Sequence, residues 1–433
     1  MLKQLATALP HDLEGTVVAV GSQIVTAEGI RVPLGSICHI QSNSCAATLA
    51  EVVAIEGNQT RLAPLDRSHG VSTGEKVRFV TVTPTIPVSP QLLGRAVDCE
   101  GKPIDGGSPI ASAFCQPIRA EPTQCLNRER CLQAIATGVR SIDAFHTLAQ
   151  GQRIGIFAGA GVGKSSLLGM LARGTSADVV VAGLIGERGR EVNDFLHHEL
   201  TPELRSRSVT VVETSEASAT RRVQAALSAT SIAEYFRDQG LNVLLLMDSV
   251  TRFAQAQREI GLAAGEPPTT RGYPPSVFSA LPQLLERAGI NENKNGKRGS
   301  ITGIYSVLVE GDDPNEPISD ALRGILDGHI LMSRNLAECG HFPAIEVTKS
   351  ISRLHAQVCT EEHQRAAEIV RGMLADYLQH IDLIDIGAYQ EGHNPRVDRA
   401  IAAKPSIDAF LQQRRNEPTS WETMLEGLTE LAK

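Results

Sequence analysis

Hydrophobic positions follow three different patterns along the chain, and the first covers about residues 14–88. Short apolar runs such as Gly15–Val20, Ala47–Ile55 and Lys76–Val82 are separated by glycine-containing turns. Runs of this length and spacing are typical of β strands in a small barrel or sandwich. Three prolines between residues 84 and 90 then interrupt the pattern and predict a boundary.

The second pattern, from about residue 91 to 350, alternates nearly continuous apolar runs with segments of helical periodicity. Strands that are apolar along their whole length fit burial on both faces, so the alternation predicts a mainly parallel α/β sheet. The clearest helix is Ala219–Asp238, which Gly240 ends. The predicted strands are Arg153–Ala158, Val179–Ile185, Val209–Val212, Asn242–Met247 and Ser300–Val309.

The third pattern begins after about residue 355, where strand signals cease. Acidic residues such as those of Thr360-Glu-Glu stand where first helical turns are expected, which favours helices up to the last residue.

Composition changes this picture mainly by what it excludes. The 433 residues are 42% hydrophobic and 21% charged, as in ordinary globular proteins, and the net charge of −8 argues against binding nucleic acid through phosphates. No apolar run has the length of a membrane span, and we find no signal-peptide core. The eight cysteines include no C-x-x-C pair, so we expect reduced thiols in a cytosolic protein and no transition-metal site.

A glycine loop after the first predicted strand of the sheet carries the clearest chemistry. Gly159, Gly161 and Gly163 let backbone N–H groups approach phosphate oxygens, and a helix is expected behind them. Lys164 can reach the β and γ phosphates, and the Ser165 hydroxyl is placed to ligate Mg²⁺. The predicted nucleotide-binding loop comprises Gly159, Ala160, Gly161, Val162, Gly163, Lys164, Ser165 and Ser166, although Ala158 replaces the usual first glycine.

Two further apolar strands end in carboxylates. Asp248 follows Asn242–Met247 and suits the metal side of a phosphate site, although an Asp here also serves as a helix N-cap. Glu187 follows Val179–Ile185 and would face the same edge of a parallel sheet. It is a general base for the attacking water, or a structural Glu paired with Arg188 or Arg190, and the residues alone leave both open.

The combined motifs resemble the type III protein-export ATPases, which serve the bacterial flagellum and the related injectisome and are relatives of rotary ATP synthase subunits. The resemblance covers nearly the whole chain from residue 14. It rests on Ala158–Ser165, Ile185–Glu191, Met247–Phe253, Gly265–Phe278, Val309–Pro317, Leu326–Ile330 and Ser350–Arg353.

The resemblance implies a fold and a set of site residues. The expected fold is α/β: an N-terminal β-barrel at 1–88, a RecA-like P-loop ATPase core at 89–354, and a C-terminal helical domain at 355–433. Glu187 is then the carboxylate that activates water, Asp248 and Ser165 lie at the Mg²⁺, and Arg188 lies beside the ATP. Arg353 matches the arginine finger, Phe342 the aromatic that stacks on adenine, and Tyr389 a residue that closes that pocket from the C-terminal domain.

Further expectations concern partners. Glu187 and Arg353 on one chain predict complete sites built between identical subunits, hence a homohexamer. The family also implies a coiled-coil central stalk, a regulatory stator-like protein, export chaperones and substrates, and peripheral contact with the inner-membrane export gate. We expect the stalk to contact Tyr273–Pro275 and Glu310–Asp313, and the short N-terminus leaves regulator binding in doubt or dependent on Leu2–Leu9.

Two other functions compete with export. A rotary ATP synthase subunit shares the core motifs, but Ile185–Glu191 and Glu310–Pro317 argue against it. An RNA translocase of the termination type would need aromatic side chains in its small β domain to stack on bases. Residues 1–90 contain a single Phe, Tyr or Trp, which is Phe79, and this argues against RNA binding. Within the export family, Glu346–Arg353 and Ile386–Tyr389 favour the flagellar branch.

Overall fold

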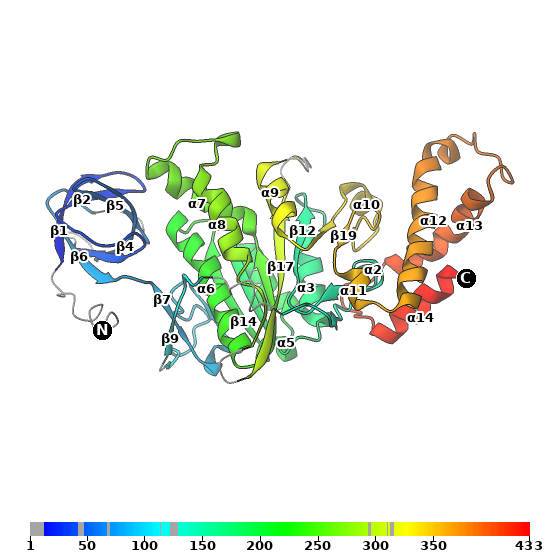
Figure 1. Ribbon diagram of the computed structural model, residues 1–433, viewed down its shortest axis with the longest axis horizontal. Coiled ribbons are helices and arrows are strands. Elements are labelled where there is room, and N and C mark those ends of the chain that lie inside the picture. The colour runs from blue at the N-terminus through cyan, green and yellow to red at the C-terminus, as the bar shows by residue number, and fades with distance from the viewer. Residues whose placement is uncertain are drawn as a thin grey trace.

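A computed structural model of the chain describes residues 13–41, 47–66, 70–112, 114–121, 129–292, 296–309, 311 and 316–433. The molecule is elongated, with a β-barrel at one end, an α/β sheet in the middle and a group of helices at the other end (Figure 1). The predicted α/β fold with an N-terminal barrel and C-terminal helices is confirmed.

The barrel closes in the strand order β1-β2-β5-β4-β3-β6. Alternate residues such as Val17, Val25, Val52, Leu62 and Val77 point inward and are fully buried, which is the period-two pattern of a strand with one solvated face. The strands are β1 Glu14–Val20, β2 Val25–Glu28, β3 Ile37–Ile40, β4 Thr48–Glu56, β5 Gln59–Pro64 and β6 Lys76–Thr81.

The central sheet has nine strands in the order β19-β18-β12-β17-β15-β13-β14-β8, with β16 paired to β17 outside this path. Every neighbouring pair is parallel except β18 with β19 and β16 with β17. The strands are β8 Ala96–Val97, β12 Arg153–Ala158, β13 Val179–Glu187, β14 Ser208–Thr214, β15 Asn242–Asp248, β16 Gly289–Glu292, β17 Arg298–Leu308, β18 Gly328–Leu331 and β19 Ile351–Ser352.

Both faces of this sheet are covered by helices, which explains the continuous apolar runs. Leu245 and Met247 of β15 pack in the hydrophobic cluster that contains α6 and α8, whereas Leu244 and Leu246 pack in the cluster that contains α3. The helices of the α/β unit are α2 Arg140–Phe145, α3 Lys164–Gly174, α4 Gly189–Asp194, α5 Pro202–Ser206, α6 Ala219–Asp238, α7 Val250–Ala263, α8 Pro275–Leu285, α9 Pro317–Ile325 and α10 Arg334–Glu338.

Short segments join these parts. β7 Thr85–Val88 pairs with β9 Phe114–Pro117, β10 Ala134–Ile135 pairs with β11 Leu148–Ala149, and a π-helix, Phe195–Glu199, follows α4. The turns η1 Pro90–Leu92 and η4 Thr270–Gly272 are 3-10 helices.

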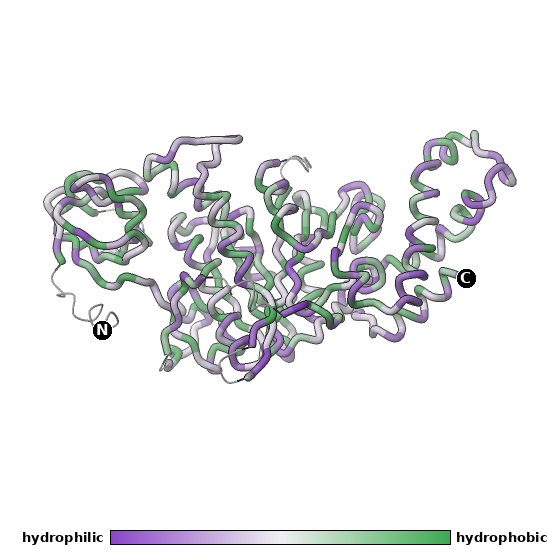
Figure 2. Tube along the Cα trace, viewed as in Figure 1, coloured by the Kyte–Doolittle hydropathy of each residue, from purple (hydrophilic) through white to green (hydrophobic). Residues whose placement is uncertain are grey.

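The C-terminal helices rest on α2. Phe145 of α2 shares a hydrophobic cluster with Val370 and Leu374 of α12 and Leu428 of α14. These helices are α11 His355–Val358, α12 Glu361–Asp385, α13 Pro395–Leu411 and α14 Trp421–Ala432. Figure 2 shows hydrophilic and hydrophobic residues alternating along them. Within the described ranges, no helix is both long and apolar enough to cross a membrane.

Candidate active site

The glycine loop connects β12 to α3 at the carboxyl edge of the sheet. Gly161 and Gly163 have φ angles of +80° and +92°, a left-handed backbone that residues with a Cβ rarely adopt. α3 then begins at Lys164, so its first N–H groups point toward the loop. The residue pattern of the loop therefore produces the backbone cradle that a phosphate requires.

A cleft of about 790 Å³ lies over this loop. Of the predicted binding residues, Gly159, Ala160, Gly161, Gly163, Lys164, Ser165, Ser166, Glu187 and Arg188 all line it. Val162 does not, because its side chain is 2% exposed and packs in the hydrophobic cluster beneath the loop. Arg188 has a side chain that is 78% exposed and reaches Glu191 at 3.5 Å.

Lys164 lies between the two predicted carboxylates. Its Nζ is 2.5 Å from Asp248 Oδ1 and 3.5 Å from Glu187 Oε1. The two acids come from the neighbouring strands β13 and β15, which both end at this edge. The position of the acids at strand ends thus brings a cation and two anions into one pocket.

Burial and charge shift the pKa values of this group. Burial and, to a lesser extent, the Asp248 charge raise the pKa of Glu187 to about 7, against the opposing positive charge of Lys164. Burial alone would lower the pKa of Lys164, but Asp248 and Glu187 outweigh it, so the net shift is upward. Lys164 therefore stays charged, whereas Glu187 titrates near neutral pH.

The donors near Asp248 fit a hard cation. Ser165, Glu187 and Asp248 line a second cavity of about 110 Å³ beside the phosphate loop. Hydroxyl and carboxylate oxygens are the donors that Mg²⁺ takes, with the remaining positions supplied by phosphate oxygens and water. Among the described residues, no group of three or more His, Cys, Asp or Glu side chains is placed to hold a metal ion by itself.

Sequence reasoning missed Ser306, which lies near the carboxyl end of β17. Its buried hydroxyl donates a 2.5 Å hydrogen bond to Asp248 Oδ1, the same oxygen that accepts from Lys164. This contact from a fully buried side chain helps to fix the Asp248 carboxylate. A serine inside an apolar strand was the only signal for it, and such residues are usually structural.

Phe342 lies beside the end of the glycine loop. Its ring is 3.5 Å from the position that a Cβ on Gly163 would occupy, and the residue is 46% exposed. The ring is therefore available to a flat ligand bound next to the phosphates.

Tyr389, which the family resemblance assigns to the closing of the adenine pocket, is not among the residues that line this cleft. It lies in the connection between α12 and α13, which Figure 1 places at the end of the C-terminal helices away from α3. Its hydroxyl donates to Asp398 Oδ1 at 2.8 Å. The C-terminal residues that approach Phe342 instead follow α13, where Gln413 N donates to Phe342 O at 2.9 Å.

Arg353 lies at the opposite edge of the sheet from the glycine loop. β19 runs antiparallel to β18 with Ser352 paired to Gly328, so the chain leaves the sheet at the start of β18. Arg353 N then donates to Asp327 O at 3.0 Å, and its exposed side chain reaches only Arg323 O, at 3.3 Å. Arg353 is thus not placed to reach the phosphates bound by its own chain.

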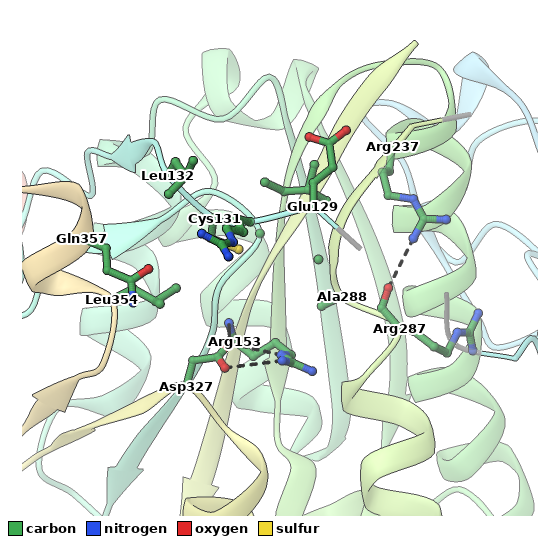
Figure 3. A pocket seen from close by; sticks show the side chains of 14 residues that line it. Glu129, Cys131, Leu132, Arg153, Arg237, Arg287, Ala288, Asp327, Leu354 and Gln357 are labelled. Atoms are coloured by element: carbon green, nitrogen blue, oxygen red, sulfur yellow. Dashed lines mark hydrogen bonds and ion pairs between the residues drawn. The ribbon is translucent and has the colours of Figure 1, made fainter. Parts of the chain in front are cut away.

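A separate cavity of about 460 Å³ opens beside Arg353, with Leu354 in its lining (Figure 3). Two of its arginines are engaged within the chain: Arg153 pairs with Asp327, and Arg237 donates to the Arg287 carbonyl. It has neither the glycine loop nor the helix start of the first cleft. We assign the nucleotide to the carboxyl edge.

Comparison with known protein families agrees with this geometry. The nucleotide-binding domain of the ATP synthase alpha/beta family matches residues 138–352, and the T3SS EscN ATPase C-terminal domain matches residues 359–430. The flagellum-specific ATP synthase of Salmonella typhimurium is 46% identical over 94% of this chain and 90% of its own length. The type 3 secretion system ATPase of Xanthomonas euvesicatoria is 45% identical over 99% of this chain and 96% of its own.

Solved structures extend the likeness to three dimensions. The assembled ATPase EscN from the type III secretion system of enteropathogenic E. coli superimposes with a TM-score of 0.91 at 45% identity, covering 97% of this chain and all of that one. The same ATPase in complex with its central stalk EscO gives a TM-score of 0.88 at 44% identity, with the same coverage.

Proposed function

Since the chain belongs to the family of type III export ATPases, we propose that it hydrolyses ATP with Mg²⁺ to drive protein export through the flagellar apparatus. Relatives that are 43–46% identical over more than nine-tenths of this chain establish the family. The observation that supports the chemistry best is Lys164 held between Glu187 and Asp248 at the edge of the glycine loop.

The proposed reaction uses these groups in a defined order. The triphosphate binds the backbone N–H groups of residues 159–163, and Lys164 turns from Asp248 to the phosphates. Ser165 and Asp248 would hold Mg²⁺, which would neutralise charge that develops on the phosphates. Glu187, relieved of Lys164, orients the attacking water and accepts its proton. Ser306 keeps Asp248 in place as the lysine leaves.

We further propose that Phe342 stacks on the adenine. Its ring lies next to Gly163 of the phosphate loop and is partly exposed, so an aromatic face is accessible to a base that is attached to bound phosphates. Arg188, exposed at the rim of the same cleft, would lie beside the phosphates.

The position of Arg353 supports a shared site. A guanidinium at the amino edge can stabilise transition-state charge only in a nucleotide bound by another copy, which leads us to propose a homohexameric ring. We also propose domain boundaries near residues 88 and 354, which separate the barrel, the ATPase core and the helical domain of each chain.

The proposed partners follow from the family. A central coiled-coil stalk would contact the connection between α7 and α8 at Tyr273–Pro275; this connection touches the barrel through Arg61, whose Nη1 donates to Ala264 O. The second predicted stalk segment, Glu310–Asp313, has only Gly311 within the described residues, and Leu2–Leu9 lies outside them. We also propose a stator-like regulator, export chaperones with their substrates, and cytoplasmic placement at the inner-membrane export gate.

One experiment separates export from other roles and one branch from the other. A strain that lacks this chain should lose flagellar export and motility, and the wild-type gene should restore them whereas Glu187→Gln should not. If the strain that lacks this chain loses secretion through an injectisome but remains motile, the chain belongs to the injectisome branch instead. Neighbouring genes for flagellar rod and hook proteins, or for injectisome needle proteins, give an independent answer.

A further inference from the structure

The connection between α13 and α14, residues 412–420, belongs to the C-terminal helices but is fixed to the nucleotide cleft. Gln413 N donates to Phe342 O at 2.9 Å, and Thr419 N donates to Gly138 O at 3.1 Å. Arg173, in the last turn of α3, donates through Nη2 to Arg415 O at 2.9 Å. This connection therefore touches both Phe342 and the helix that begins at Lys164.

The side chain of Gln413 holds the connection in this position. It is 6% exposed, and both the oxygen and the nitrogen of its amide are hydrogen-bonded. Nε2 donates to Gly138 O at 2.7 Å and to Glu417 O at 2.6 Å, while Oε1 accepts from Arg140 N at 2.9 Å. The preceding residue, Gln412, has an exposed side chain and offers a natural control.

A cluster of ion pairs around the buried Glu199 carboxylate anchors the same connection to α3. The Glu199 carboxylate, at the end of the π-helix, pairs with Arg173 at 2.6 Å and with Arg415. It also lies directly against Gly169 of α3. Residues 412–420 therefore rest on α3 through a second contact, independent of Gln413.

Phe342, in contrast, has little packing to hold its ring. Almost half of the residue is exposed, so its orientation depends on how its backbone is fixed. The carbonyl of Phe342 accepts from Gln413 N, and Gln413 is in turn fixed to Gly138 and Arg140.

We propose that Gln413 is a positioning residue for the adenine base, acting through Phe342. Its buried amide fixes the backbone that holds Phe342 beside Gly163, so that the aromatic ring is ready before the nucleotide arrives. This inference rests on the proposed stacking of Phe342 on adenine. It assigns to the C-terminal helices a role in nucleotide affinity that does not involve any contact with phosphate.

The experiment measures binding of two probes to the full chain by titration calorimetry in Mg²⁺ buffer: ATP, and inorganic tripolyphosphate, which lacks a base. Gln413→Met keeps the length of the side chain but removes its hydrogen bonds, and Gln413→Glu keeps an acceptor but turns carboxylate oxygen toward two carbonyls. Gln412→Met is the matched control. Each Gln413 variant should weaken ATP binding about tenfold, as expected for a buried hydrogen-bonded group, while tripolyphosphate binding stays unchanged.

A double variant with Phe342→Ala tests the route. If Gln413 acts through Phe342, Gln413→Met has no further effect on ATP binding once the ring is absent. Equal weakening of both probes, or additive effects in the double variant, would overturn the role of Gln413. Unchanged ATP binding by Phe342→Ala alone would instead overturn the stacking on which the inference rests.

Discussion

The ammonium group of Lys164 faces two largely buried carboxylates in the cleft, those of Glu187 and Asp248. We predict that Lys164→Ala reduces ATP turnover by at least about a hundredfold, since the phosphates lose their main cationic partner. Phosphate release by the purified chain measures this. Lys102→Ala, an exposed lysine paired with Glu100, should retain full turnover. A Lys164→Ala chain with more than about a tenth of normal turnover would contradict the assignment.

Glu187 should determine how activity depends on pH. Because burial and the Asp248 charge raise the pKa of Glu187 to about 7, the carboxyl becomes protonated below neutral pH and can no longer accept a proton from water. We predict that kcat/KM for ATP falls about tenfold for each pH unit below about 7 and levels off above it. A profile that stays flat through pH 7 would exclude Glu187 as the base, and Glu187→Gln should bind ATP without turning it over.

At the scale of single residues, the sequence predicts those site residues whose role is indicated by their neighbours along the chain. Glu187 and Asp248 each end an apolar strand, and Lys164 ends a glycine loop, so their convergence follows from the direction of parallel strands. Gln413 and Ser306 have no such signal, because tertiary packing alone brings them to Phe342 and Asp248. The same reason applies to Tyr389, which the family resemblance assigns to the adenine pocket but which lies in the connection between α12 and α13.

At the scale of elements, long apolar or strongly periodic segments were predictable. β12 and α6 have the expected bounds, β14 is longer than expected at both ends, and β15 is longer only by Asp248. Burial on both faces produces a pattern that the sequence displays directly. The π-helix Phe195–Glu199 has no comparable pattern, since its wider turn depends on packing of Glu199 against α3.

This packing makes Gly169 an unusual helical glycine. Alanine normally stabilises a helix interior by about 0.5–1 kcal/mol over glycine. A Cβ on Gly169, however, would lie 1.8 Å from Glu199 Oε2 and displace a carboxylate that pairs with Arg173 and Arg415. We predict that Gly169→Ala lowers the free energy of unfolding by about 1–3 kcal/mol, measured from the urea midpoint of the full chain.

Gly372 of α12 provides the control for that substitution. Nothing lies within 4 Å of the Cβ that an alanine would add there, so Gly372→Ala should stabilise the chain by about 0.5–1 kcal/mol. Opposite signs for the two substitutions test the contact between Glu199 and α3. If alanine is stabilising at both glycines, the Glu199 side chain can move away from the added Cβ without loss of stability.

At the scale of the whole molecule, the separation of Lys164 and Arg353 leads to a prediction about mixed rings. Rings of Lys164→Ala alone or Arg353→Ala alone should be inactive, although Arg353→Ala should still bind ATP. Co-expressed in equal amounts, the two variants form interfaces in which an intact loop of one chain meets an intact arginine of the other. We expect activity to return to as much as about a quarter of normal, because about one interface in four is of this kind.

The readout is ATP hydrolysis by rings purified through two different tags, one on each variant. A mixture that remains inactive would show that Arg353 serves its own subunit or takes no part in hydrolysis. The control is co-expression of the Lys164→Ala chain with the Glu187→Gln chain. Both defects lie in the half of the site that carries the glycine loop, so no interface between the two variants is complete.

The overall plan of three units was also predictable, since each has its own period of hydrophobic residues. How the units meet was not. Arg221 of α6 binds Asp98 and Glu213 of the α/β unit and approaches Asp66 after β5, a set of contacts that joins barrel to core across long stretches of sequence. Charged residues scattered in this way look like ordinary surface positions until the chain folds.

The direction of the strands has a consequence for assembly. With a phosphate-binding edge and an arginine-bearing edge on opposite ends of one sheet, each subunit has a front and a back. In a head-to-tail series, every contact would join the phosphate-binding edge of one subunit to the arginine-bearing edge of the next and so complete one site. A ring built in this way is directional, because each subunit would receive an arginine from the neighbour on one side and would supply its own arginine to the neighbour on the other side. That asymmetry is set when a single chain folds, before any second chain is met.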